Sequence, residues 1–542
     1  MEIRKFFVRS ETACAEISAQ VFSTRLCERG IPQGEDGFRV VFSHTRGKES
    51  GYELSADESG AEVRASDASG FFGGAGALLR RMDFAGGTAR LEAFRLSFVP
   101  ACEIRGAYFA SHFHNFYITA PAERRKRYIE DIALMGCNTF MLVFPMINLD
   151  REGDAAWESE AEKLAEMFGY ARRAGMKNAL LLQPNSGYRI YPAEYRAEPV
   201  ADPYWRRGNT GNMLCYSKAE KLLDGYNENL LRRFRTCGID MVMTWPYDEG
   251  GCGCAECAPW GGNGFVRASR KLFETARKIL PGVRRAVSAW AFDSPDGGDW
   301  KGLSESLKGE KWADYILADS HEDFPRTILE EGVPGDLPLL NFPEISMWGM
   351  FPWGGFGASM FPKRLETLFR QVRGKLAGGF FYSEGIFEDL NKAVVAHFYN
   401  TGRADSREAV RAYARYELGL SDASAFLELT DCLEDNHTDA FRSRRVNLQR
   451  VARAFDLARE IDASLEEWAK TCWRWRLIAI RAELDFIRFS KIPEVPEDYK
   501  VWRELLEDEP RARELCAELA EIYSSLKEDG DDPFHVRVHP II

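Results

Sequence analysis

Ile104-Arg-Gly-Ala-Tyr-Phe109 begins a region in which short apolar segments alternate with charged segments whose apolar residues recur at helical spacing. This alternation is typical of parallel βα units. Eight apolar segments follow one another, and each is expected to form a strand: Ile104–Phe109, Thr139–Phe144, Ala179–Gln183, Met241–Tyr247, Ala286–Phe292, Tyr315–Asp319, Leu339–Phe342 and Gly379–Ser383. Eight βα units in about 300 residues indicate a (β/α)8 TIM barrel over residues 101–402.

The segments on either side of this region have other patterns. Residues 1–100 contain alternating stretches such as Phe38–Phe42 and a glycine-rich helical segment, Ser69–Met82, which predict a small N-terminal α/β domain. After Thr401 the strand signals end, and long charged segments with helical spacing predict an all-α domain over residues 403–542. A chain of 542 residues is too long for one hydrophobic core, which agrees with three domains.

Charge and composition exclude several classes of protein. The chain has 71 Lys and Arg against 83 Asp and Glu, a net charge of −12 spread along its length, which excludes a nucleic-acid partner and an anionic membrane surface. No apolar run approaches the ~20 residues of a membrane span. The N-terminus lacks the apolar core of a secretory signal, so we expect a cytoplasmic protein. No G-x-G-x-x-G follows the first strand, which leaves a dinucleotide fold without support.

The loops after the strands of a TIM barrel form its active-site face, and polar and aromatic residues gather at these positions here. Carboxylates beside tryptophans are what glycosidic cleavage needs, because one acid must protonate the leaving oxygen while a second group stabilises or attacks the oxocarbenium-like centre. A single strand-end acid is more simply a helix cap or ion-pair partner. The whole set on one rim predicts a glycosidase: His112, His114, Asp248, Glu249, Trp290, Glu344, Trp348, Trp353, Tyr382 and Glu384.

The stretch Ile104-Arg-Gly-Ala-Tyr108, the α/β domain before it and the Asp248-Glu249 pair resemble glycoside hydrolase family 20, the β-N-acetylhexosaminidases. The three-domain architecture with a helical C-terminal part is also similar to the α-glucuronidases and the family 84 enzymes. The chain departs from family 20 at two places. Trp245-Pro-Tyr247 replaces the family's histidine–glycine–glycine lead, and Asn341-Phe-Pro-Glu344 has no clear match to its tyrosine after strand 7.

The resemblance implies an exo-acting hydrolase that cleaves terminal sugars from small oligosaccharides or glycosides without a cofactor. Glu249 would be the general acid/base, and Asp248 would orient the acetamido group that attacks the anomeric carbon. Arg105 would hold the 3- and 4-hydroxyls, and Glu384 would bind the 4- or 6-hydroxyl. The aromatic walls of the site would come from Trp290 with Trp348 or Trp353. The remaining candidates for sugar contact are His112, His114 and Tyr382.

Two alternatives stay open. Glu344 after strand 7 is a candidate nucleophile opposite Glu249, the strand pair that retaining glycosidases use, in an α-glucuronidase-like or other exo-glycosidase. A uronate substrate would need a second cation, for which Arg189 or Lys392 is placed after a strand. From another class of protein, the chain would be a sugar-binding barrel that has lost catalysis.

The segment Cys252-Gly-Cys-Ala-Glu-Cys257 is the densest group among the 12 cysteines. Its spacing is compatible with the start of a zinc site, with Cys215, Cys237 or His321 as a remote fourth ligand. Because a second C-x2-C pair is absent, we favour a reduced turn that shapes the rim and expect no metal.

The C-terminal helices carry more apolar residues than one exposed helix usually shows. The segment Leu465–Phe489 includes Trp468, Trp473 and Trp475. We therefore predict a homodimer through the C-terminal helices.

Overall fold

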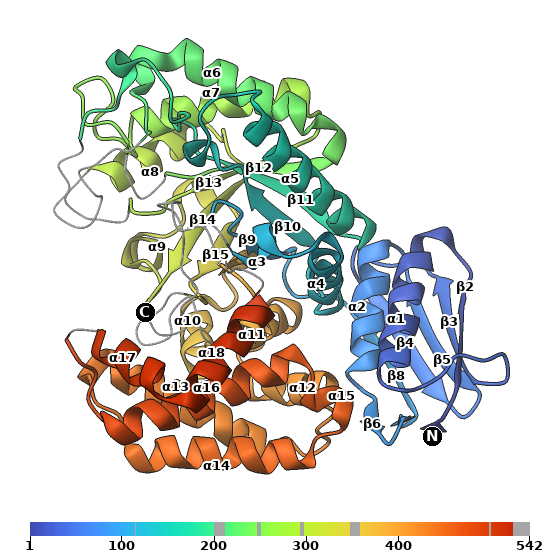
Figure 1. Ribbon diagram of the computed structural model, residues 1–542. Helices are drawn as coiled ribbons and strands as arrows, with labels where there is room; N and C mark the ends of the chain where they lie inside the picture. Colours follow the sequence, from blue (N-terminus) through green and yellow to red (C-terminus); the bar gives the residue numbers. More distant parts are fainter. Residues whose placement is uncertain are drawn as a thin grey trace.

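Eight parallel strands close into a barrel at the centre of the computed structural model, which describes residues 1–113, 115–199, 212–246, 251–292, 298–346, 358–497 and 500–523 (Figure 1). The strand order is β10-β11-β12-β13-β14-β15-β16-β9, and pairing of β16 with β9 completes the ring. The predicted TIM barrel is therefore confirmed. Its strands are β9 Ile104–Phe109, β10 Thr139–Val143, β11 Lys177–Leu182, β12 Ile239–Thr244, β13 Arg284–Ser288, β14 Tyr315–Ser320, β15 Leu339–Pro343 and β16 Leu376–Ser383.

Amphipathic helices cover the outside of the barrel, and their apolar stripes pack against the strands. They are α3 Phe116–Thr119, α4 Ala122–Leu134, α5 Ala155–Arg173, α6 Tyr216–Arg233, α7 Gly264–Ile279, α8 Asp299–Gly309, α9 Arg326–Glu331, α10 Pro362–Val372 and α11 Asp389–Thr401. Helix α6 ends at Arg233, and a 3-10 turn then runs to Gly238, whose φ of 66° is a left-handed conformation that ends helices.

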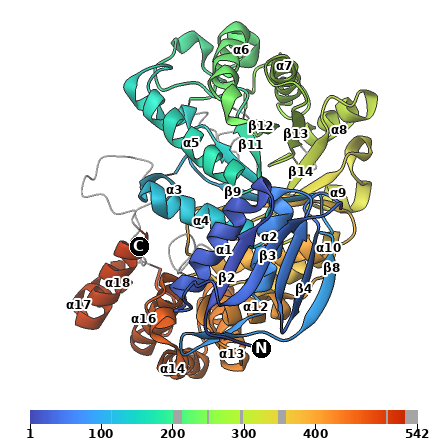
Figure 2. The same cartoon turned by 90° about the vertical axis from the view of Figure 1, so that its right-hand side faces the viewer.

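A mixed five-stranded sheet forms the N-terminal unit, in the order β2-β3-β5-β4-β8, beside a small sheet β1-β7-β6. Figure 2 views this unit from its own side. Helices α1 Glu16–Glu28 and α2 Ala68–Leu79 lie between its sheet and the barrel (Figure 1). A Cβ on Gly76 of α2 would stand 1.9 Å from the Leu134 carbonyl oxygen, so this glycine lets α2 and α4 touch. The strands are β1 Glu2–Ile3, β2 Phe6–Ser10, β3 Phe38–His44, β4 Tyr52–Asp57, β5 Gly60–Ala65, β6 Asp83–Ala85, β7 Thr88–Arg90 and β8 Phe94–Phe98.

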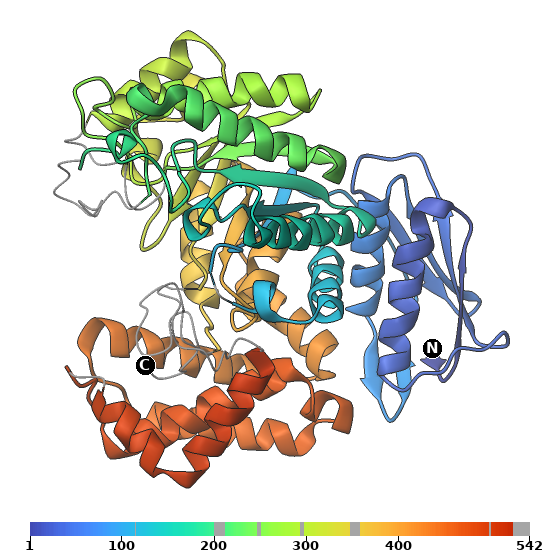
Figure 3. The same cartoon turned by 45° about the horizontal axis from the view of Figure 1, so that its top comes forward.

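The predicted all-α region follows the barrel and lies on the side opposite α6 and α7 (Figures 1 and 3). Its helices are α12 Ser406–Leu418, α13 Ser424–Ser443, α14 Leu448–Ser464, α15 Glu467–Lys470, α16 Trp473–Lys491, α17 Lys500–Asp508 and α18 Pro510–Tyr523. The expected single segment Leu465–Phe489 is two helices, α15 and α16. Trp475 is fully buried inside this unit, while Trp468 and Trp473 are half-buried. The apolar residues that motivated the homodimer are thus largely used within the chain, and the homodimer itself stays a prediction.

One carboxylate joins the three units. Asp131 on α4 accepts a hydrogen bond of 2.9 Å from Arg25 of α1 and another of 2.9 Å from Arg474 of α16. All three side chains are buried, so each charge is compensated inside the protein. The chain entering β9 also bonds to the end of α11, with the Ala101 N–H 2.8 Å from the carbonyl oxygen of Asn400. The domain boundaries near residues 100 and 402 stay a prediction.

The part of the chain that the structure describes contains no helix long and apolar enough to cross a membrane.

Candidate active site

Side chains from several strands face the C-terminal mouth of the barrel. Phe342 of β15 and Tyr382 of β16 belong to the cluster that fills the barrel interior. Since strand side chains alternate with a period of two, Glu344 and Glu384 lie on the same inner side, one step closer to the mouth. The structure thus brings five of the predicted residues to this end of the barrel: His112, Trp290, Glu344, Tyr382 and Glu384.

Aromatic rings form one wall of this mouth. The rings of Trp245 and Trp290 stack with centroids 5.3 Å apart and an interplanar angle of 29°. Phe342 continues the wall, 4.8 Å from Trp245 and 5.4 Å from Tyr108. Tyr108 in turn stacks on Tyr382 at 5.7 Å. Flat aromatic faces of this kind offer an apolar surface to the C–H face of a sugar ring.

The side chain and backbone of Glu344 are both fixed at the end of β15. Its side chain is buried, with the residue 5% exposed, and its Oε1 accepts a hydrogen bond of 2.6 Å from the Ser346 N–H. The Glu344 backbone is fixed on both sides. Its N–H donates to the Ser320 carbonyl oxygen at 3.0 Å, and the Arg364 guanidinium donates to the Glu344 carbonyl oxygen at 2.7 Å. These contacts hold the Glu344 side chain in one orientation.

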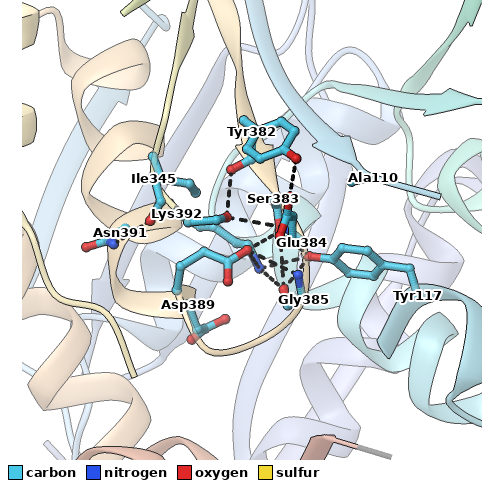
Figure 4. A network of polar contacts seen from close by, with 12 residues as sticks. Ala110, Tyr117, Ile345, Tyr382, Ser383, Glu384, Gly385, Asp389, Asn391 and Lys392 are labelled. Carbon is cyan, nitrogen blue, oxygen red and sulfur yellow. Dashed lines mark hydrogen bonds and ion pairs between the residues drawn. The ribbon is translucent and has the colours of Figure 1, made fainter. Parts of the chain in front are cut away.

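Glu384 lies at the end of the neighbouring strand and is 4% exposed (Figure 4). The Tyr382 hydroxyl donates to Glu384 Oε1. Burial, and after it the nearby Glu384 carboxylate, raise the pKa of Tyr382 well above its usual range, so the phenol keeps its proton and remains a donor.

Ser346 connects the Glu344 side chain to the backbone of β16 at Glu384, and sequence reasoning missed it. Its N–H binds Glu344, while its hydroxyl donates to the Tyr382 carbonyl oxygen at 3.2 Å and accepts from the Glu384 N–H at 3.3 Å. Ser346 therefore sets the position of Glu344 relative to Glu384.

A buried polar network connects the end of β16 to the start of α11 (Figure 4). Ser383 donates to Glu388, and Lys392 forms a 3.3 Å ion pair with Glu388 and donates to the Tyr128 hydroxyl at 2.6 Å. Burial raises the pKa of Glu388 and lowers that of Lys392. Lys392 is fully enclosed, so it does not fit the expected role of a cation that meets a uronate.

His112 lies beside the mouth, 7% exposed, with its Nδ1 3.2 Å from the Tyr108 hydroxyl oxygen. Burial lowers its pKa to about 3. The imidazole is therefore neutral near pH 7 and contributes hydrogen bonding rather than charge to the site.

Arg105 lies at the opposite end of the barrel, and its expected role as a ligand of sugar hydroxyls does not fit this placement. It follows the inward-facing Ile104, so its side chain points out of the barrel near the start of β9. The guanidinium donates to the carbonyl oxygens of Gly136 and Cys102, at 2.8 Å and 2.9 Å. Arg105 therefore fixes loops at the N-terminal end.

Five further predicted residues lie outside the described residues: His114, Asp248, Glu249, Trp348 and Trp353. The described neighbours of Asp248 and Glu249 are the strand β12, which ends at Thr244, and the loop that resumes at Gly251.

Cys252, Cys254 and Cys257 lie together with Cys215 in one buried group beside the mouth. Of the other two residues considered as partners for them, Cys237 follows α6 at the far end of that helix, and His321 packs on Trp290 with centroids 5.2 Å apart.

No protein-family model matches the chain, and no curated protein matches it. Solved structures do. A family 89 glycoside hydrolase from Clostridium perfringens is similar over 94% of this chain and 65% of its own, at 11% identity and a TM-score of 0.60. A family 138 enzyme described as targeting pectin rhamnogalacturonan II is similar over 96% of this chain and 74% of its own, at 11% identity and a TM-score of 0.56. The chain has the fold of these glycoside hydrolases.

The resemblance to family 20 is likewise confirmed at the level of the fold. An exo-β-N-acetylglucosaminidase of family 20 from Vibrio harveyi is similar over 77% of this chain and 74% of its own, at 12% identity and a TM-score of 0.52. The family 89 and 138 enzymes match more of this chain than the family 20 enzyme does.

Proposed function

We propose that the chain is an exo-acting glycoside hydrolase that removes a terminal N-acetylhexosamine residue from a small oligosaccharide or glycoside. The observation that carries the proposal is the pair of buried carboxylates, Glu344 and Glu384, fixed through Ser346 at an aromatic-lined barrel mouth. Carboxylates provide the charge for an oxocarbenium-like transition state, and the aromatic wall provides a sugar-binding face.

The substrate class is supported by two of the similar structures. The Vibrio harveyi enzyme is described as an exo-β-N-acetylglucosaminidase in complex with N-acetylglucosamine. The Clostridium perfringens enzyme, with two glutamates changed to glutamine, is described in complex with its substrate GlcNAc-α-1,4-galactose. An acetamido sugar at the non-reducing end is common to both, although the two linkages differ.

For the chemistry we propose Glu344 as the nucleophile and Glu249 as the general acid/base. Glu344 would attack the anomeric carbon while Glu249 gives its proton to the departing oxygen; water activated by Glu249 would then release the sugar with retained configuration. The fixed, inward-facing carboxylate of Glu344 supports this assignment over one in which the substrate's own acetamido group attacks with help from Asp248. Glu384 and Tyr382 would bind hydroxyls of the same sugar.

A panel of nitrophenyl glycosides tests the proposal. We expect release of nitrophenol from an N-acetylhexosaminide and little from glucosides, galactosides or glucuronides, and proton NMR should show the first-formed product with the anomeric configuration of the substrate. Turnover confined to sugars without a 2-acetamido group would contradict the substrate class. Thermal stabilisation by sugars with no turnover of any glycoside would make the protein a sugar-binding barrel instead.

A further inference from the structure

Four cysteine side chains converge beside the barrel mouth. Cys215 is the residue that precedes α6, while Cys252, Cys254 and Cys257 belong to the loop between β12 and α7. All four are buried, and their sulfur atoms lie within 4.8 Å of one another. Cys215 comes from a segment about 40 residues away in the sequence, so the fold, rather than a local turn, completes the set.

The spacing of the sulfurs fits one small metal ion. Cys215 Sγ lies 3.7 Å from Cys254 Sγ and 4.0 Å from Cys257 Sγ. Four sulfurs at the corners of a tetrahedron around zinc, each about 2.3 Å from the ion, stand about 3.8 Å apart. A disulfide would require about 2.05 Å. An iron–sulfur cluster would need a wider cage to hold its inorganic sulfides.

Hydrogen-bond donors surround the sulfurs as they surround metal-bound thiolates. The Glu198 N–H donates to Cys252 Sγ at 3.4 Å. The Ser217 hydroxyl lies 3.1 Å from Cys215 Sγ, and the Arg267 guanidinium lies 3.9 Å from Cys257 Sγ. Donors and a positive charge at these distances reduce the cost of holding negative sulfurs in a buried site, and they orient the ligands.

The loop itself has little other structure. Residues 251–263 contain turns and neither helix nor strand. The Cys257 and Ala258 N–H groups both donate to the Cys254 carbonyl oxygen, at 3.0 Å and 2.9 Å, which folds the C-x2-C segment into a tight turn. Such a turn presents both thiols on one side, as a tetrahedral site requires.

We propose that Cys215, Cys252, Cys254 and Cys257 bind a structural zinc ion. Four protein ligands close the coordination sphere, so the ion takes no part in glycosidic cleavage and acts as a cross-link between the loop after β12 and the start of α6. This replaces the reduced turn favoured from the sequence, where the fourth ligand was undecided. Cys252 follows Glu249, the proposed acid/base, by three residues in the sequence.

Metal analysis of the intact protein, purified without chelator or added metal, is the direct test. We expect about one zinc ion per chain by mass spectrometry of the metal content. Cys215→Ser should abolish the bound zinc, and Cys215→His, which offers another zinc ligand, should restore it. Cys237→Ser is the matched control, because this thiol lies at the opposite end of α6, and its zinc content should equal that of the wild type.

A second measurement keeps the test valid if Cys215→Ser fails to fold. Wild-type protein produced in cobalt-containing medium should show the intense visible absorption of a tetrahedral cobalt thiolate site. Zinc-free folded protein whose four cysteines react with a thiol reagent, disulfides among them by mass spectrometry, or stoichiometric iron would each overturn the proposal. Since no readout uses turnover, these experiments test the zinc site independently of the proposed glycosidase activity.

Discussion

The two ends of the barrel hold their charged side chains in different ways. At the N-terminal end, polar side chains bind the protein itself: Arg105 donates to loop carbonyls, and Arg285 forms a two-point ion pair with Asp314. At the C-terminal end, Glu344 and Glu384 are held by N–H and O–H donors on the inner face of the strands. The difference shows that a charged residue on a barrel strand indicates a functional site only when it lies at the C-terminal end of the strand and faces inward.

The largest effect should follow from removing the charge of Glu344. In Glu344→Gln we expect turnover of an aryl N-acetylhexosaminide to fall by at least about 10³-fold, because the nucleophile and its negative charge are lost while the hydrogen bond from Ser346 has a similar acceptor. Glu344→Ala should regain turnover of an activated substrate when azide is added, a response that a purely structural carboxylate would not give.

Glu417→Gln serves as the control for Glu344, since this carboxylate is also buried but pairs with Arg474 on the C-terminal helices. It should keep turnover within about threefold of the wild type and change only stability. If Glu344→Gln remains within tenfold of the wild type while Asp248→Asn is inactive, catalysis is substrate-assisted and our assignment of Glu344 is wrong.

The N-terminal end should respond in stability rather than in catalysis. Arg105→Met removes two charge-assisted hydrogen bonds to buried carbonyl oxygens, so the free energy of unfolding in urea should fall by about 2–4 kcal/mol. The folded fraction should retain kcat/KM within about threefold of the wild type. A tenfold rise in KM with unchanged stability would instead indicate that Arg105 binds the sugar.

The sequence contained most of the barrel but only part of the site. The βα rhythm located all eight strands, and the residues directly after them gave Glu344 and Glu384, because strand ends converge whatever their partners. Arg105 was misplaced although its phase was visible: it follows Ile104, an inward position, and stands at the start of the strand. Attention to the two-residue period would have excluded it.

Other site residues depend on tertiary register that no local pattern encodes. Ser346 binds both carboxylate segments only because β15 and β16 lie side by side with Glu344 opposite Tyr382. Cys215 likewise joins the other thiols only when the start of α6 packs on the loop after β12. Ser346 was not predicted as a site residue, and Cys215 was only one of three candidates for the fourth ligand.

Trp290 and Trp312 lie at opposite ends of the barrel, so replacing each tryptophan by alanine compares the two ends. Trp290→Ala removes a half-buried ring from the mouth, and kcat/KM should fall about tenfold as the sugar loses an aromatic face. Trp312 is buried just before β14, near Phe273. Trp312→Ala should lower the free energy of unfolding by about 3–5 kcal/mol and leave KM unchanged. Equal kinetic losses in the two variants would show that the mouth does not bind the substrate.

The smallest effect should come from His112 and should appear only in acid. Because its folded pKa is about 3 and an unfolded histidine titrates near 6.5, the native state binds fewer protons than the unfolded state between these values. Its contribution to stability is therefore complete above pH 6.5 and is lost as the pH falls toward 3, by about 1.4 kcal/mol between pH 7.5 and 5.5.

Urea unfolding at a series of pH values should show a smaller loss of stability in acid for His112→Gln than for the wild type. The same change at His44, exposed on β3, should leave the slope as it is. Parallel slopes for wild type and His112→Gln would mean that this imidazole takes up a proton without unfolding, and its assignment as a neutral hydrogen-bonding group of the mouth would then be wrong.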